Sequence, residues 1–74
     1  MADPIIPVYK FAHGQRVRFI LPPSDEIREG VVFIKCGLKN LGDWWVDADD
    51  RALMTEPLNI PGRVAVREFN MEAA

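Results

Sequence analysis

Residues 30–36 read Gly-Val-Val-Phe-Ile-Lys-Cys. The Val-Val-Phe-Ile run inside this stretch is continuous and rich in β-branched and aromatic side chains, which is typical of a central strand covered on both faces. The next segment, 37–42, begins and ends with glycine, and it leads to Trp44-Trp45-Val46. Such spacing predicts a hairpin connection between two neighbouring strands.

Two further segments have strand patterns. Residues 16–21 alternate, so that Val17, Phe19 and Leu21 would share one face. In residues 63–69, Val64 and Val66 would face inward in the same way. Because no segment has the length of a normal helix, the chain is predicted to be all-β, with four to five strands in a small SH3-like barrel or a curled antiparallel sheet.

The expected organisation is one small domain. The prolines Pro4 and Pro7 predict an extended N-terminal arm over 1–12. Residues 13–70 would form the β domain, and 71–74 would be a flexible tail. A chain of 74 residues is long enough for one domain only.

The order of these elements resembles that of SH3-like small barrels. An opening Gly-x-x-Val-x-Phe strand (14–19) precedes a long loop, a Glu-Gly-Val-Val segment (29–32), a Trp-bearing strand (44–46) and a closing Arg-Val-Ala-Val strand (63–66). The resemblance covers most of the chain and implies that the first and last strands pair. An OB-like or open Greek-key sheet would have a similar order, so these alternatives stay open.

The chain is poor in the side chains that most enzyme mechanisms use. It has one each of serine, threonine, histidine, cysteine and tyrosine: Ser24, Thr55, His13, Cys36 and Tyr9. We therefore expect no catalytic residues, no metal and no cofactor. A single cysteine excludes an internal disulfide and suits a reducing compartment, so a cytoplasmic protein is expected. No apolar stretch approaches the roughly 20 residues that span a membrane.

The leading functional hypothesis is a non-enzymatic module that binds another protein. Strand alternation places Trp44 in the core with Val46, and Trp45 on the outside. Tryptophan is enriched at binding hot spots because it buries a large area with few rotatable bonds. The expected partner-binding surface is Trp45 with Phe33, surrounded by an acidic rim at Asp47, Asp49 and Asp50.

The alternative hypothesis is nucleic-acid binding through arginines. If the 16–21 and 63–69 strands pair, Arg16 and Arg18 would lie beside Arg63 and Arg67 and could bind phosphate or another anion. The formal net charge of −2 argues against a sequence-independent polyanion binder. The charge is uneven, at +2 over 1–42 and −4 over 43–74, which favours steering of partners or self-association.

A third hypothesis is an enzyme whose site forms only in a homo-oligomer. The barrel order is similar to that of the plasmid-borne type of dihydrofolate reductase, in which a ring of barrels encloses a central pore. The Val-Gln-Ile-Tyr segment that this family uses for ligand contact is missing here, since Arg-Val-Ala-Val stands at 63–66. The resemblance therefore implies at most a similar assembly.

Overall fold

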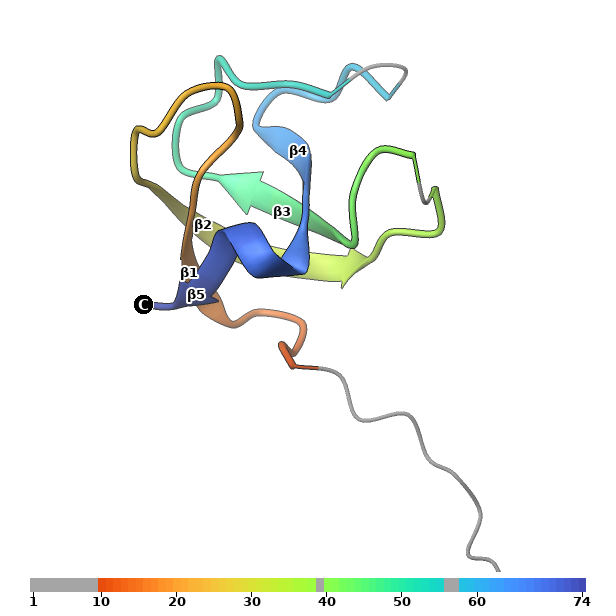
Figure 1. Ribbon diagram of the computed structural model, residues 1–74. Helices are drawn as coiled ribbons and strands as arrows, with labels where there is room; N and C mark the ends of the chain where they lie inside the picture. The colour runs from red at the N-terminus through yellow and green to blue at the C-terminus, as the bar shows by residue number, and fades with distance from the viewer. Residues whose placement is uncertain (1–9, 39, 56–57) are drawn as a thin grey trace, which may run out of the picture.

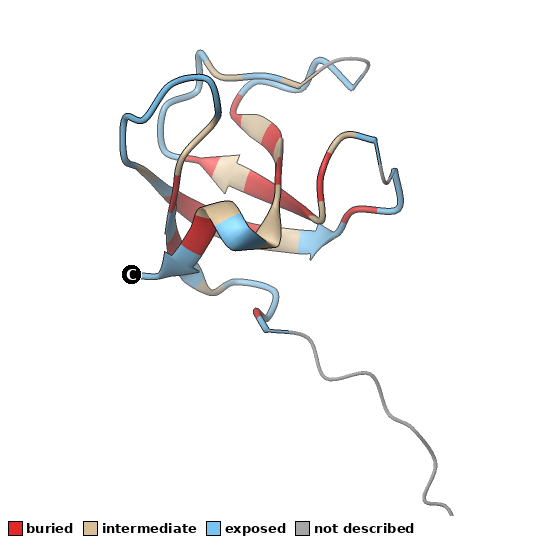
Figure 2. Ribbon diagram, in the orientation of Figure 1, coloured by how far each residue is buried: buried red, intermediate tan, exposed pale blue. Residues whose placement is uncertain are grey.

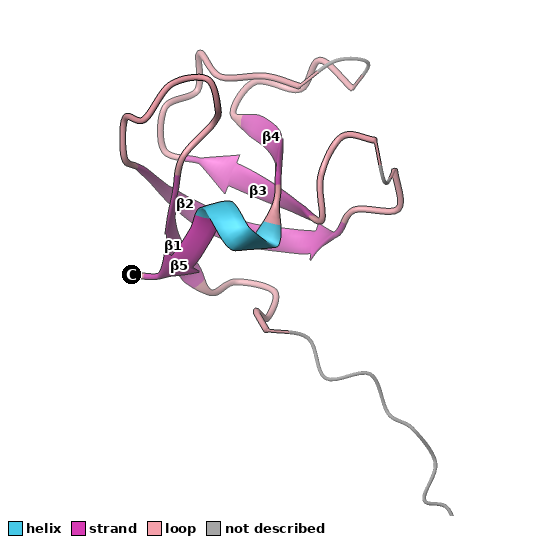
Figure 3. Ribbon diagram, in the orientation of Figure 1, coloured by secondary structure: helices cyan, strands magenta, loops and turns pink. Residues whose placement is uncertain are grey.

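The computed structural model describes residues 10–38, 40–55 and 58–74. Its elements are β1 (Arg16–Phe19), β2 (Arg28–Lys35), β3 (Trp44–Ala48), β4 (Arg63–Val66), the 3₁₀ turn η1 (Glu68–Asn70) and β5 (Met71–Ala73) (Figure 1). Within these ranges η1 is the only helical element (Figure 3). No helix among the described residues is long and apolar enough to cross a membrane.

The five strands form one antiparallel sheet in the order β4-β3-β2-β1-β5. Strands β2, β3 and β4 follow one another as neighbours, and β5 returns to pair with β1. β4 and β5 stand at the two ends of this order and do not pair, so the sheet curls without closing into a barrel (Figure 1). The all-β prediction is confirmed, and of the two expected architectures the curled sheet is the one formed.

The C-terminal part differs from the expectation. The strand expected over 63–69 ends at Val66, because the chain turns into η1 and the Glu68 amide donates a hydrogen bond to Asp43 Oδ2 at 2.8 Å. Residues 71–74 were expected as a flexible tail, but 71–73 form β5 and pair with β1, Met71 lying opposite Phe19. A strand of three residues is too short to show an alternating pattern in the sequence. The formation of β5 depends instead on its pairing with the distant strand β1.

The core is built mainly from the strands, which carry most of the buried residues coloured red in Figure 2. The predicted inward positions Val17, Phe19, Val64 and Val66 are all buried, as is Trp44. Every strand contributes to this cluster, whose members are Phe11, Val17, Phe19, Val32, Trp44, Val46, Ala48, Val64, Val66 and Met71.

The N-terminal end of the described chain is tied to this core. Phe11 is buried, and its ring meets Trp44 edge to face with 6.0 Å between the ring centroids. The expected extended arm spans 1–12, of which 1–9 lie outside the described residues. The domain therefore begins at the latest at Phe11, two residues earlier than expected.

Candidate functional site

Trp45 is not the exposed anchor that the alternation predicted. It lies outside the core cluster, opposite Ile34 and Ala65 on the neighbouring strands, so the prediction of its face is confirmed. Its side chain is nevertheless only 8% exposed. The expectation of an accessible Trp45 is therefore wrong, because being outside the core does not by itself expose a side chain.

Phe33 is also largely used within the domain. The Arg63 guanidinium lies over its ring, 3.9 Å from the centroid, and the His13 ring meets it at a steep angle. His13 Nδ1 donates a hydrogen bond to the Phe33 carbonyl oxygen at 2.6 Å. The register of β2 against β3 shifts between Val32 and Ile34, which places Phe33 at the irregularity. Of the expected aromatic face, Trp45 is thus buried and Phe33 is half-buried under Arg63.

The three aspartates of the expected acidic rim each pair with an arginine. Asp47 accepts two hydrogen bonds from Arg63, at 2.8 and 3.2 Å. Asp49 pairs with Arg16, and Asp50 with Arg28 at 3.4 Å. Among the described residues no group of three or more His, Cys, Asp or Glu side chains could hold a metal ion. The acidic turn is therefore a set of ion pairs between strands and loops.

The contact between Arg16 and Asp49 shifts the pKa of both side chains. The hydrogen bonds that Arg16 donates hold the pKa of the Asp49 carboxyl below its ordinary value, and partial desolvation opposes this effect. The same contact raises the pKa of Arg16. Glu29 is a second carboxylate near Arg16, at 3.7 Å.

The arginine ladder expected for nucleic acid does not form. β1 and β4 are separated by β2 and β3 in the sheet, so Arg16 and Arg18 do not lie beside Arg63 and Arg67. Arg18 instead pairs with Glu72 of β5 at 3.5 Å. The premise of that hypothesis, pairing of these two strands, is wrong because β5 and not β4 occupies the free side of β1.

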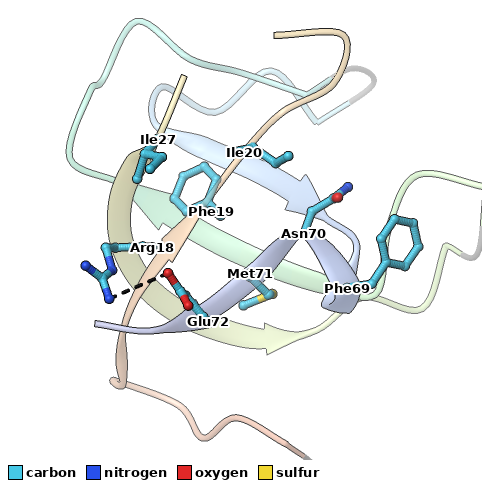
Figure 4. A pocket seen from close by; sticks show the side chains of 8 residues that line it. All are labelled: Arg18, Phe19, Ile20, Ile27, Phe69, Asn70, Met71 and Glu72. Atoms are coloured by element: carbon cyan, nitrogen blue, oxygen red, sulfur yellow. Dashed lines mark ion pairs between the residues drawn. The ribbon is translucent and has the colours of Figure 1, made fainter. Parts of the chain in front are cut away.

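The largest apolar exposure lies elsewhere, around η1. Phe69 is 83% exposed and Ile27, in the loop between β1 and β2, is 69% exposed. Both side chains border a hollow of about 270 Å³ (Figure 4). This first hollow is lined by Arg18, Phe19, Ile20, Ile27, Phe69, Asn70, Met71 and Glu72.

A second hollow of about 480 Å³ lies on the other side of the same turn. Ile20, Phe69 and Asn70 line both hollows, so the two hollows adjoin at these residues. The second hollow continues over apolar side chains of the loops and of β4, among them Leu21, Leu53, Val64 and Val66. We refer to the two hollows together as the groove.

The backbone on both sides of Phe69 is anchored. Trp44 Nε1 donates a hydrogen bond to Glu68 Oε1 at 3.2 Å, and the Glu68 amide donates to Asp43. On the other side, the Ile20 amide donates to the Asn70 carbonyl oxygen at 3.0 Å. Phe69 is thus an exposed aromatic side chain on a fixed turn. Such preorganisation lowers the entropy that a partner must overcome on binding.

The sequence contained one signal for this turn. Continued alternation from Val64 and Val66 would place Glu68 inward, and an unpaired carboxylate in the core is costly. The strand therefore had to break before Glu68, which releases Phe69 from the inward pattern. Nothing in the local sequence indicated that Ile27 would border the same hollow.

No protein-family model matches the chain, and searches of curated proteins and of solved structures found no significant match.

Proposed function

We propose that the chain is a non-enzymatic module that binds another protein through the groove, with Phe69 as the anchoring side chain. The observation that carries the proposal is an aromatic ring 83% exposed on a turn whose flanking residues are both hydrogen-bonded. Large exposed apolar patches that are rimmed by polar residues often mark protein–protein interaction sites. Ile27 and Ile20 extend the apolar surface beside it.

The chemistry of the groove favours an extended apolar segment of the partner. Phe69 borders both hollows, so a chain crossing the groove could place one apolar side chain in each hollow and contact Phe69 from both. The Arg18–Glu72 ion pair borders the first hollow and would form a polar rim. An aromatic anchor with apolar neighbours and a polar rim is the usual composition of a binding hot spot.

Two finer assignments belong to this proposal. For the SH3-like resemblance, β1 does pair with the last strand of the chain, but that strand is β5 and not the closing strand expected at 63–66. The free thiol of Cys36 is buried and suits a reducing, cytoplasmic setting. Neither assignment is needed for binding at the groove.

The proposal can be tested with random peptides displayed on phage. We expect the full chain to enrich apolar peptides, and the Phe69→Ser variant to bind a selected synthetic peptide about tenfold or more weakly, measured by fluorescence anisotropy. Ile34→Ser is the matched control, because Ile34 is also exposed, at 49%, but lines neither hollow. Equal binding by Phe69→Ser and the wild type would refute the assignment of the groove.

A further inference from the structure

We infer that the groove is also the binding site of the chain's own N-terminal segment, residues 4–8, which competes with the partner. This inference rests on the proposed function of the groove and names the class of ligand that it takes. The segment reads Pro-Ile-Ile-Pro-Val and carries no charged side chain. It lies outside the described residues, which begin at residue 10.

The start of the described chain is connected to the turn that carries Phe69. Phe11 packs against Trp44, and Trp44 donates a hydrogen bond to Glu68, the residue before Phe69. Phe11 and Trp44 do not line either hollow themselves, so the segment before Phe11 would have to pass this turn to enter the groove. The six residues from Pro4 to Tyr9 span about 19 Å in a polyproline II conformation, at about 3.1 Å per residue. That length is sufficient to reach across a neighbouring turn.

The segment and the groove also match in chemistry. The segment is apolar and the groove is lined largely by apolar side chains, and the two prolines restrict the segment before it binds, so less conformational entropy is lost on docking. A proline has no backbone N–H, so it leaves no donor unpaired against an apolar surface. The outer face of the sheet is the side opposite the core, and it carries Arg16 and Arg63. It offers no comparable site, because these two arginines are engaged with carboxylates.

A spin label near the N-terminus tests the contact in the full chain. We would attach a nitroxide to Ala2→Cys in a Cys36→Ala background, since Cys36 is the only native cysteine. The amide resonances of Ile20, Phe69 and Asn70 should broaden more strongly than those of β3. Broadening should be lost in Ile5→Asp/Ile6→Asp and kept in the control Asp3→Asn. Absence of broadening at the groove would overturn the inference.

The same comparison can be made without a label, in case Cys36→Ala disturbs the fold. The amide chemical shifts of the groove residues should differ between the wild type and Ile5→Asp/Ile6→Asp, while Asp3→Asn should leave them unchanged. Identical shifts in all three proteins would count against docking of the segment.

A mixture of spin-labelled chain with unlabelled, ¹⁵N-enriched chain identifies the occupant. Broadening in the mixture would place the segment in the groove of a second copy and would overturn the intramolecular assignment. The effect on a phage-selected peptide separates this inference from the proposed function. If the segment fills the groove nine-tenths of the time, Ile5→Asp/Ile6→Asp should bind that peptide about tenfold more tightly. Unchanged affinity would refute competition while leaving the partner site intact, whereas docking without any peptide binding would refute the proposed function alone.

Discussion

The outer face of the sheet and the groove differ in whether their side chains have partners within the domain. On the outer face, Arg16 and Arg63 each lie within ion-pairing distance of a carboxylate. In the groove, Phe69 and Ile27 remain mostly exposed. The sequence pattern had suggested the opposite distribution, with aromatic anchors and free charges on the outer face.

The difference indicates where a partner would gain most. Binding at a face of formed ion pairs requires those charges to be desolvated, and the cost can exceed the gain. Covering Phe69 and Ile27 removes apolar area from water without breaking an existing contact. The groove is therefore the more favourable binding surface, although the outer face has more charged side chains.

The largest expected effect concerns Trp45. Because its side chain is only 8% exposed, Trp45→Ala should lower the free energy of unfolding by about 3 kcal/mol. Phe69→Ala should change it by no more than about 0.5 kcal/mol, since the ring is mostly in solvent. Urea denaturation of the two variants measures both values. Similar losses would mean that Phe69 is packed in solution and that the two regions do not differ.

Particular residues explain how far the sequence could be interpreted. Period-two alternation correctly placed Val17 and Val64 inward, because that pattern depends only on local strand geometry. It also placed Trp45 on the correct face but could not show that this face covers it. The position of Phe69 depends on hydrogen bonds between η1 and the β3 region, and these join residues more than twenty positions apart. Such contacts leave no local pattern.

An intermediate effect is expected at Thr55, which lies on the free edge of β4. Its amide donates a hydrogen bond to the Arg63 carbonyl oxygen at 3.1 Å, and its Oγ1 accepts one from the Ala65 amide at 3.0 Å. Thr55→Val removes the second bond and leaves that amide without its acceptor, so unfolding should become easier by about 1–2 kcal/mol. Urea denaturation measures the loss, and amide exchange at Ala65 should accelerate.

Thr55→Ser is the matched control, because it keeps the hydroxyl. Thr55 and Ala65 also line the second hollow. If Thr55→Val weakens peptide binding while Thr55→Ser does not, the side of the groove formed by β4 depends on this bond. Equal stability of both variants would show that the hydroxyl does not hold the edge in solution.

The smallest effect is expected at the Arg16–Asp49 pair on the outer face. Because Arg16 holds the pKa of Asp49 below its ordinary value in the folded state, the pair stabilises the fold above the unfolded pKa of about 3.9. The contribution is lost as the pH falls through the lower folded pKa. The stability difference between the wild type and Asp49→Asn should therefore be present at neutral pH and vanish in acid. Both side chains are half exposed, so solvent screening keeps it small.

An NMR titration of the Asp49 carboxyl measures this pair directly. In the wild type the carboxyl should titrate below the ordinary range for aspartate, and Arg16→Gln should raise its pKa toward that range. Arg18→Gln is the matched control, because Arg18 pairs with Glu72 and should leave Asp49 unchanged. An ordinary pKa for Asp49 in the wild type would show that Arg16 does not pair with Asp49 in solution. Arg16 would then keep only the more distant Glu29 as a partner, and the contrast between the outer face and the groove would weaken at that position.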